Sequence, residues 1–451
     1  MSESRFTYSL DQLQEMSARV LGLAKAAGAS AAETDISLGV GQNVSVRMGE
    51  TETIEYNRDK GASVTVYFGQ QRGHASTSDL SEQALADTVA AACNIARYTA
   101  RDPFCGLADA GLMATEFPDL DLYHPWPIAV EEAIEIARRC EAAARDVDPR
   151  ITNSEGASVS ASEGLSVYAN SHGFSAGYPT SRHAISASVI AEDGENMQRD
   201  YWYTTARAAD DLDTPERVGQ VAGQRTVRRL GCRRVKTVQA PVLFEAPLAS
   251  GLISSLVSAV SGGSLYRKSS FLLDSLGQQV ISPIIDIEEQ PHLPRGLASS
   301  AFDAEGVATR PRMLVEKGVL QGYMLSSYSA RKLGMTTTGN AGGNHNLIVR
   351  HVQGNAHQLG FEQLLKEMGT GLLVTELLGH GLNMVTGNYS RGAAGFWVEN
   401  GVIAYPVEEI TIAGNMKEML LQIVALGNDV LVQGSRQVGS ILVERMTVAG
   451  E

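Results

Sequence analysis

Residues 43–69, NVSVRMGETETIEYNRDKGASVTVYFG, decide the fold class of the N-terminal half of the chain. Apolar and polar residues alternate in this stretch, and a period of two is typical of half-buried β-strands. Turn-forming residues interrupt the pattern at Gly49-Glu50 and again in the Asp-Lys-Gly sequence at 59–61. The stretch therefore predicts successive strands of a β-meander that extends over residues 32–77.

The segments on either side of this meander have the spacing of amphipathic helices. Residues 9–27 place apolar side chains on one helical face, and Ser9 with Gln12 suits a capping box. A second helix is predicted at residues 81–99. The same order of helix, strands and helix then returns over residues 131–147, 151–205 and 214–231. This order suggests an internal duplication.

The rest of the chain reads mostly as strands, with hairpins at residues 313–325 and 396–407. Asn400-Gly401 suits the type I′ turn of the second hairpin, and helices are predicted at residues 247–263 and 415–427. Helices segregated from antiparallel strands indicate an α+β fold. We expect two helix–β-meander–helix units in the N-terminal half, followed by a β-rich C-terminal domain with a few helices, divided as residues 1–110, 111–235 and 236–451.

Charge and composition exclude several classes of protein. The net charge is −14 and the pI about 5.2, which disfavours direct binding of nucleic acid. The basic run at residues 225–236 is interpreted as a solvated helix end and linker, and Glu288-Glu289 as surface charges. No apolar run reaches the roughly 20 residues that cross a bilayer, and the N-terminus is polar. We expect a cytoplasmic protein that contacts no membrane.

Candidate catalytic residues are few. The nine histidines form no paired metal motif, and there is no GxSxG, phosphate-binding loop or activated cysteine. Glu376 and His380 are four residues apart, but glycines surround them and two ligands are too few for a metal site. The segment is interpreted as a hydrogen-bonded turn, with a peptide-contacting or interface loop and a metal site as alternatives.

Side chains near this turn are candidates for contact with a peptide or a partner subunit. They are Glu376, His380, Asn383, Tyr389, Arg391, Phe396 and Trp397. Aromatic and arginine side chains are common anchors of protein interfaces. The alternative for the aromatic residues is local packing of the 396–407 hairpin.

Several long segments resemble the TldD/PmbA family, in particular its PmbA (TldE) branch, historically named modulators of DNA gyrase. They include GLLVTELLGHGLNMVTGNYSRGAAGFWVENG at 371–401, SLYRKSSFLLDSLG at 264–277, FDAEGVATR at 302–310 and SSYSARKLG at 326–334. The resemblance implies a cytoplasmic bacterial protease assembled from two related subunits. It also implies removal of the leader from a microcin precursor and degradation of unfolded peptides and of an antitoxin.

The resemblance further implies that TldD-type subunits hold zinc through an HExxxH helix and a cysteine near the C-terminus. The corresponding helix here is GLISSLVSAVSGGS, residues 251–264, and the histidine positions fall near Ser255 and Val260. The stretch at residues 434–446 has no cysteine. We therefore expect no catalytic residue and no metal in this chain, with zinc in a TldD-type partner that forms a heterodimer with it, and a homodimer when the chain is isolated.

Two other hypotheses remain open. In the first hypothesis, the chain alone is a peptidase, and folding assembles its metal site from distant residues such as His183, His345 and His380. In the second it is a homodimeric peptide-binding or gyrase-associated factor without protease activity.

Overall fold

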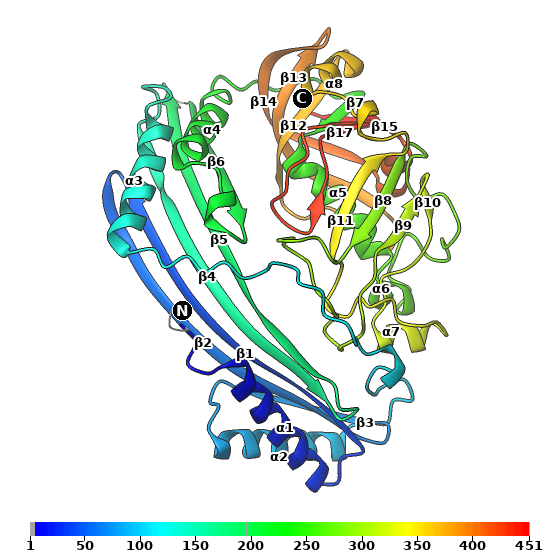
Figure 1. Cartoon of the computed structure of the whole chain (residues 1–451). Helices are drawn as coiled ribbons and strands as arrows, with labels where there is room; N and C mark the ends of the chain where they lie inside the picture. Colours follow the sequence, from blue (N-terminus) through cyan, green and yellow to red (C-terminus); the bar gives the residue numbers. More distant parts are fainter. Residues whose placement is uncertain (1–4, 195, 451) are drawn as a thin grey trace.

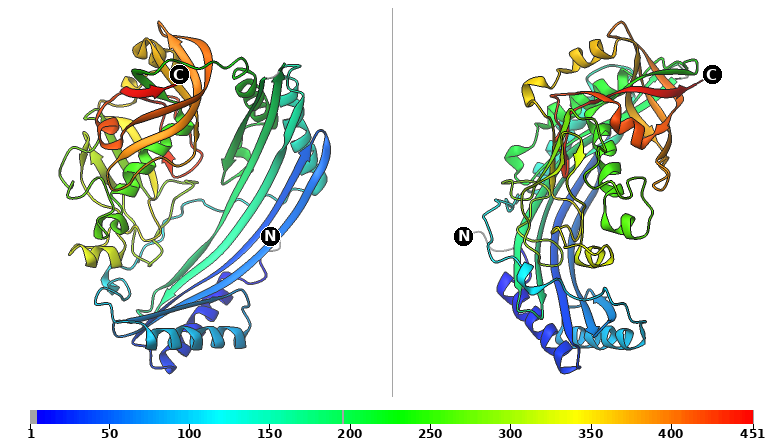
Figure 2. Two further views of the ribbon diagram at one scale, coloured as in Figure 1. Left: turned by 180° about the vertical axis from the view of Figure 1, so that it is seen from behind. Right: turned by 90° about the vertical axis from the view of Figure 1, so that its right-hand side faces the viewer.

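A long curved sheet and a β-rich C-terminal body lie side by side in the protein (Figures 1 and 2). The computed structural model describes residues 5–194 and 196–450. The chain exposes 20246 Å² of surface, whereas a monomer of 48.1 kDa is expected to expose roughly 16,500 Å². The excess area reflects the open arrangement of the two parts.

The curved sheet contains all strands of the N-terminal half in the order β3-β2-β1-β4-β5-β6, and each strand is antiparallel to its neighbours. Because β1 pairs with β4, the two predicted units share one sheet, and their strands follow in reverse order on either side of the β1–β4 boundary. The predicted domain boundaries within this half stay a prediction. The strands are β1 (Ala31–Arg47), β2 (Glu50–Phe68), β3 (Gln71–Thr77), β4 (Asn153–Asn170), β5 (Ser175–Asp193) and β6 (Asn196–Ala206).

Four helices cover only one face of this sheet (Figure 1). They are α1 (Leu10–Ala26), α2 (Glu82–Tyr98), α3 (Val130–Arg145) and α4 (Pro215–Val227). Side chains such as Ile36 and Val44 of β1 are fully buried beneath them, whereas the alternate residues face the other side. The predicted helices are confirmed, including the capping box of Ser9 with Gln12. The expected α+β class is also confirmed, and each of the two N-terminal units has the order helix, meander, helix.

The turn predicted at residues 59–61 is wrong. Strand β2 continues through this segment, and Asp59 and Lys60 pair with Gly39 and Leu38 of β1. Because β1 offers an unbroken ladder of hydrogen-bonding groups, β2 stays extended, and its charged side chains simply project into water. The chain reverses direction only at Met48 and Gly49, which both have positive φ.

A buried carboxylate fastens this β1–β2 turn to α3. Glu141 is 1% exposed, and its carboxylate accepts hydrogen bonds from the backbone N–H groups of Met48 and Gly49, both at 2.8 Å. Arg138 donates from Nε to the carbonyl oxygen of Gly49 at 2.9 Å. A hydrogen bond to a charged acceptor contributes about 1.5–3 kcal/mol, so α3 holds the tip of a very long hairpin.

The segment between α2 and α3, residues 99–129, joins the sheet to the C-terminal body and is called the strap here. It includes the 3₁₀ turn Ala110–Leu112. The N–H of Ala114 donates to the carbonyl oxygen of Gly306 at 3.0 Å, Arg331 donates to that of Gly106 at 3.1 Å, and Arg295 contacts Asp121 at 2.7 Å. The strap therefore connects the two parts along much of its length.

The C-terminal body consists of two sheets around one large aliphatic core. One sheet has the order β10-β9-β8-β11-β16 and the other β14-β13-β12-β7-β17-β15, with an additional β14–β17 pairing that partly closes it. The first contains β8 (Ile285–Gln290), β9 (Arg312–Glu316), β10 (Val319–Leu320), β11 (Asn346–His351) and β16 (Arg436–Gln437). The second contains β7 (Val238–Phe244), β12 (Gly371–Leu378), β13 (Asn388–Glu399), β14 (Val402–Asn415), β15 (Ile423–Leu426) and β17 (Ile441–Ala449).

Short helices fill the ends of this body: α5 (Ala246–Ala259), α6 (Gly262–Tyr266), α7 (Ser327–Lys332), α8 (Phe361–Met368) and α9 (Met416–Leu421). The two predicted hairpins are confirmed, with positive φ at Asn400 and Gly401. The helix predicted over 415–427 is wrong beyond Leu421, because the apolar residues 423–426 form β15 and pair with β17. The part of the chain described contains no helix long and apolar enough to cross a membrane.

Candidate functional site

The face of the curved sheet without helices, called the inner face here, carries small hydroxyl-bearing side chains. Ser158 and Ser186 lie opposite each other on β4 and β5 with their Oγ atoms 2.8 Å apart, and Ser45 Oγ lies 2.7 Å from Thr53 Oγ1 on β2. Ser160 and Ser188 belong to the same set, and the amide-bearing Asn43 lies opposite Ser160. Charged side chains stand beside these serines, since Ser188 donates to Glu155 at 2.7 Å and Arg199 lies 3.0 Å from the same carboxylate.

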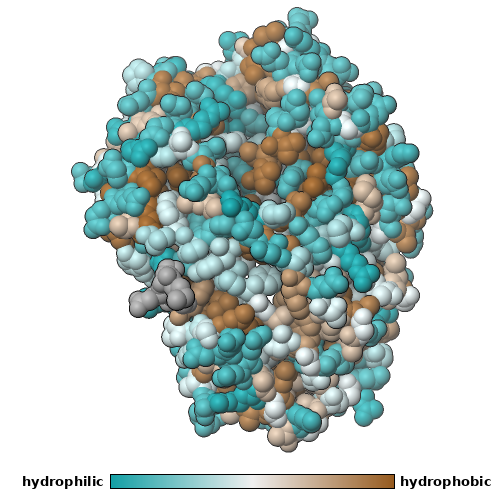
Figure 3. All heavy atoms as spheres, in the orientation of Figure 1, coloured by the Kyte–Doolittle hydropathy of each residue, from teal (hydrophilic) through white to brown (hydrophobic). Residues whose placement is uncertain are grey.

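The inner face looks toward the C-terminal body. Tyr178 OH lies 2.6 Å from Ser300 Oγ, and Gln433 Nε2 donates to the carbonyl oxygen of Tyr203 at 2.9 Å. A small cavity of about 120 Å³ separates Tyr203 from Ser250 of α5 and from Arg436. On the outside, Figure 3 shows scattered hydrophobic patches within a mainly hydrophilic surface.

At the lower end of the sheet, where β3 and α7 lie (Figure 1), a cavity of about 600 Å³ opens between the two parts. Glu33 lines it and accepts hydrogen bonds from the hydroxyl groups of Tyr67 and Tyr168, both at 2.8 Å. Burial and the adjacent Glu33 carboxylate raise the pKa of both phenols. Both phenols therefore stay protonated at neutral pH and donate to Glu33, and the Tyr168 hydroxyl oxygen also accepts from Asn170 at 3.5 Å. Glu305 and Arg72 also line the cavity, so its walls carry both signs of charge.

The helix for which the resemblance implies the zinc motif of TldD-type subunits is α5, and the side chains present at the two positions do not fit a metal ion. Ser255 donates its hydroxyl to the carbonyl oxygen of Gly251 at 2.9 Å, and Val260, directly after the helix, is fully buried. Neither side chain is an imidazole, thiolate or carboxylate, which are the ligands that zinc takes in proteins. Throughout residues 5–194 and 196–450, no group of three or more His, Cys, Asp or Glu could hold a metal ion.

The three histidines considered for a site assembled by folding are not brought together. His183 is fully buried in β5, with Nε2 2.8 Å from the carbonyl oxygen of His124, and burial lowers its pKa. His345 has Nε2 2.9 Å from the carbonyl oxygen of Gly339. His380 is exposed on a different loop.

Cys232 is likewise no activated nucleophile. Burial, together with the nearby Glu408 carboxylate, raises the pKa of its thiol to about 12. The thiolate is the reactive form of cysteine, and at neutral pH this side chain holds its proton.

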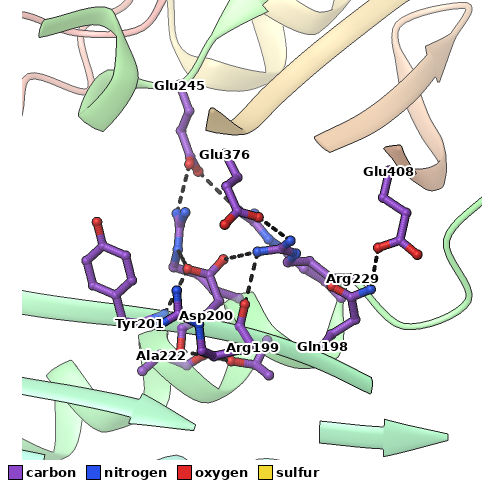
Figure 4. Close-up of polar contacts among 12 residues, drawn as sticks. Gln198, Arg199, Asp200, Tyr201, Ala222, Arg229, Glu245, Glu376 and Glu408 are labelled. Atoms are coloured by element: carbon purple, nitrogen blue, oxygen red, sulfur yellow. Dashed lines mark hydrogen bonds and ion pairs between the residues drawn. The ribbon is translucent and has the colours of Figure 1, made fainter. Parts of the chain in front are cut away.

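Glu376 takes part in a structural ion pair. At the end of β12, its carboxylate binds Arg229, whose side chain is 9% exposed and which also lies 3.8 Å from Asp200 of β6. Figure 4 shows the carboxylates of Glu245, Glu376 and Glu408 reaching from the C-terminal body toward β6 and α4. Glu376 thus joins the two parts of the molecule and is not free to bind a metal.

The interpretation of residues 225–236 as a solvated helix end and linker is therefore wrong for its first part, residues 225–229. Arg225 donates to Glu245 at 2.8 Å, and Arg228 contacts the same carboxylate at 3.2 Å. Arg225 also lies over the ring of Trp202. We call this set of buried and half-buried charges the junction network, and it comprises Arg225, Arg228, Arg229, Asp200, Glu245 and Glu376. The sequence gives no local sign of it, because its acidic members come from three other segments.

The candidate contact residues in β13 are buried or half-buried. Tyr389 and Phe396 are 5% and 2% exposed and pack inside the C-terminal body, and burial raises the pKa of Tyr389 to about 12. Trp397 is half-buried against the same core, and Arg391 donates to the carbonyl oxygen of Leu377 at 3.4 Å. A role of these side chains in contacts with another molecule stays a prediction.

His380 and Asn383 belong to the corner before β13. Asn383 Oδ1 accepts from the N–H of Val385 at 2.9 Å, which closes an Asx turn. A side chain at Gly381 would collide with the carbonyl oxygen of Ser390, 1.7 Å from the Cβ position. The glycine is required by close packing, so the corner has a structural role in the chain itself.

Two buried acids organise the loops next to the strap, and the sequence did not predict the burial of either one. Glu289 is 1% exposed and accepts from Arg312 at 2.7 Å and from Asn340 at 2.8 Å, so its interpretation as a surface charge is wrong. Asp303 accepts from the N–H groups of Val307 and Ala341. Burial raises the pKa of Asp303 to about 6.

Family models and relatives match the chain along nearly its full length. Models of PmbA/TldA metallopeptidase domain 1, central domain and C-terminal domain match residues 32–96, 123–230 and 237–450. The chain is 52% identical to Metalloprotease PmbA of Escherichia coli O157:H7, over 93% of this chain and 92% of that protein. Among solved structures, a putative modulator of DNA gyrase from Bacteroides thetaiotaomicron superposes with a TM-score of 0.90 at 28% identity, covering 98% and 99% of the two chains. TldE from Thermococcus kodakarensis has the same fold, with a TM-score of 0.80 at 20% identity over 96% and 100% of the two chains.

Proposed function

Since the chain belongs to the PmbA/TldD metallopeptidase family, we propose that it is the non-catalytic, TldE-type subunit of a two-component zinc protease. In this proposal a homologous TldD-type subunit binds the zinc ion and cleaves the peptide. The present chain supplies part of the wall around the substrate. The cytoplasm as its location, and precursor leaders and an antitoxin as its substrates, belong to the same proposal.

One observation carries the proposal: α5 offers a serine and an aliphatic side chain where the family's metal-binding helix needs imidazoles. Ser255 bonds back onto its own helix, and Val260 is buried. A catalytic zinc site needs about three protein ligands and an open position for water. A chain with this helix depends on a partner for hydrolysis.

The inner face supports the assignment of a wall. It is long and polar, and Ser158 and Ser186 share it with the Glu155–Arg199 ion pair. Hydroxyl groups exchange hydrogen bonds with peptide backbones whatever the side-chain sequence, and backbone hydrogen bonding is tolerant of sequence. Such a surface suits the passage of unfolded peptides with varied sequences.

The test measures zinc content and peptidase activity of this chain, of a TldD-type subunit and of their mixture, with an unfolded peptide as substrate. We expect no stoichiometric zinc in this chain alone, and cleavage only in the mixture. Activity of the TldD-type subunit that is unchanged by omission of this chain contradicts the proposal. So does chelator-sensitive cleavage by this chain alone.

The gyrase-associated alternative rests on the description of a similar protein as a putative modulator of DNA gyrase. Purification of this chain from cells distinguishes the two functions. Recovery of gyrase subunits without a TldD-type subunit favours the alternative, whereas recovery of the TldD-type subunit favours the protease.

A further inference from the structure

A half-buried arginine of the C-terminal body lines a small cavity and has no carboxylate to neutralise it. Arg436 begins β16, which pairs with Leu347 of β11, so its backbone is fixed in a sheet. Its Nη2 donates to Asn344 Oδ1 at 3.1 Å. Its Nε is buried without a hydrogen-bond partner among the described residues. The guanidinium therefore keeps donors that the folded chain does not use.

The arginines of the junction network each bind an acid, and Arg436 differs from them. For Arg225, burial disfavours the charge, but the carboxylates of Glu245 and Asp200 outweigh burial and raise the pKa. For Arg436, burial lowers the pKa, and no carboxylate of the described chain opposes it. A cation that is taken partly out of water without a counter-ion destabilises the fold. A bound anion would remove this cost.

The cavity beside Arg436 has a volume of about 120 Å³ and lies between α5, the loop before β16 and β6. Its walls include the side chains of Tyr203, Leu431 and Ser435, and no aspartate or glutamate belongs to the described residues that line it. The nearby carboxylate of Glu245 is already bound in the junction network. In a chain with a net charge of −14, a cavity without acids and with an unneutralised arginine favours an anionic ligand.

Two neighbouring groups strengthen this preference. Burial and the adjacent Tyr201 raise the pKa of Tyr203, so its hydroxyl keeps its proton at neutral pH and is available as a donor. Arg182 donates from Nε to Thr205 at 3.1 Å and from Nη2 to the carbonyl oxygen of Gln433 at 3.4 Å. Neither acceptor is charged, so Arg182 adds a second positive charge on the loop that lines the cavity.

The size and place of the cavity indicate the end of a chain as its ligand. Pockets for complete drug-sized molecules measure about 300–1,000 Å³, and this cavity is much smaller. Tyr203 lies directly opposite Ser186 in the β5–β6 ladder, so an extended peptide on the inner face reaches Arg436 with one terminus. Only the C-terminus of a peptide is an anion, and a guanidinium binds a carboxylate through two parallel hydrogen bonds.

We propose that this cavity binds the C-terminal carboxylate of an unfolded peptide, with Arg436 as its counter-ion and the Tyr203 hydroxyl as a second donor. The inference rests on the proposed function for the peptide as ligand, and it adds which end of the peptide this chain recognises. Every unmodified peptide has this group whatever its side chains, so its recognition is compatible with substrates of varied sequence.

A change of the peptide's end group tests the inference on the full-length chain alone. The probe is a short peptide of alanine, glycine and serine residues with a fluorophore at its N-terminus. Fluorescence anisotropy measures its dissociation constant with a free C-terminal carboxylate and with a C-terminal amide. We expect the native chain to bind the amide at least about tenfold more weakly, because the charge-assisted hydrogen bonds to Arg436 are lost.

Variants then assign this discrimination to Arg436. Arg436→Gln removes the charge, and we expect it to bind the two peptides within about twofold of each other. Arg436→Lys keeps the charge without the planar fork and should retain part of the discrimination. Arg58→Gln, an equal loss of charge at an exposed position of β2, is the matched control and should discriminate like the native chain. Circular dichroism checks that each variant folds, and the native chain with its two peptides decides the question if Arg436→Gln does not.

Three results overturn the inference. The first is absent or equal binding of the carboxylate and amide peptides by the native chain, and binding of inorganic phosphate in that case assigns the cavity to phosphate. The second is a folded Arg436→Gln chain that still discriminates tenfold, which places the recognition elsewhere. The third is an amidated peptide with one glutamate side chain that binds as tightly as the free carboxylate, which makes any carboxylate sufficient.

None of these measurements needs a TldD-type subunit. A negative result therefore removes the carboxylate site and leaves the two-component protease to its own test of zinc content and activity. Conversely, failure of the protease proposal leaves the measured dependence on the end group unchanged.

Discussion

The curved sheet and the C-terminal body use the same kind of strand in opposite ways. Strands of the sheet bury one face under helices α1 to α4 and leave polar side chains on the inner face. Strands of the C-terminal body turn aliphatic side chains toward a shared core, which includes Phe244 and Ile287 at 0% exposure. The difference teaches that the second face of a strand decides whether it builds a core or a surface.

The junction network lies between these two regions and belongs fully to neither. Its arginines come from α4 and the turn after it, and its acids come from β6, β12 and the residue before α5. Buried ion pairs add little net stability, but loss of one partner is costly. The network therefore fixes how the sheet and the body are oriented toward each other.

The largest effect is expected in the core of the body. Phe244→Ala removes a fully buried ring and should cost about 3–5 kcal/mol of unfolding free energy. Tyr98→Ala, at a site 92% exposed, is the control and should cost almost nothing. Denaturant unfolding measures the loss of unfolding free energy in both variants. Similar losses in Phe244→Ala and Tyr98→Ala would contradict a main core in the C-terminal body.

The second effect concerns the junction network. Arg229→Ala removes the cation of Glu376 and leaves Asp200 with Arg225 alone, and it should cost about 3 kcal/mol, because uncompensated buried charge is destabilising. Arg234→Ala removes the exposed contact to Glu409 and should cost less than about 1 kcal/mol. Equal midpoints of urea unfolding for the two variants would rule out a special role of the buried pair.

A pH dependence is expected from Asp303 in the body. Burial raises the pKa of Asp303 to about 6, compared with about 3.9 for an unfolded aspartate. Between these values the native chain keeps a proton that the unfolded chain has released. This carboxyl therefore stabilises the fold less as the pH rises from about 4 to 6, by at most about 3 kcal/mol.

Comparison with Asp303→Asn isolates this contribution, because the amide does not titrate. Urea unfolding at pH 4 and pH 7 gives the stability of each chain. We expect the advantage of the native chain over the variant to shrink as the pH rises, and a growing advantage would contradict the raised pKa.

The smallest effect sharpens the contrast between the two faces of one strand. Ser186→Ala on the inner face of β5 should change stability by less than about 0.5 kcal/mol. Ala187→Ser, its neighbour on the helix-covered face at 2% exposure, should cost about 1–3 kcal/mol because it buries a hydroxyl. If the two thermal midpoints shift equally, the inner face is not an open surface.

Local patterns were sufficient for most elements and failed where distant partners intervene. The caps of α1 and α4 and the Asn400-Gly401 turn follow from residues a few positions apart. The turn expected at 59–61 did not form, because an unbroken β1 lies beside it. The helix expected to reach residue 427 ends earlier, because residues 423–426 pair with β17 as a strand.

The candidate site shows the same division. Serines occupy alternate positions of β4 and β5, but no local pattern showed that this face turns toward the C-terminal body. Glu376 was singled out beside His380, and the structure instead pairs it with Arg229, 147 residues away in the chain. The sequence suggested Glu376 as a possible metal ligand, whereas the folded chain uses it as a structural contact.

The amino-acid sequence by itself determined the class of fold, the order of helices and meanders, and the side chains available on α5. Those features depend on spacing within a few residues and on residue type. Tertiary structure alone decided the continuous sheet, the burial of Glu289 and Arg229, and the cavity beside Arg436. Burial and pairing are properties of surfaces that meet only after distant segments have packed together.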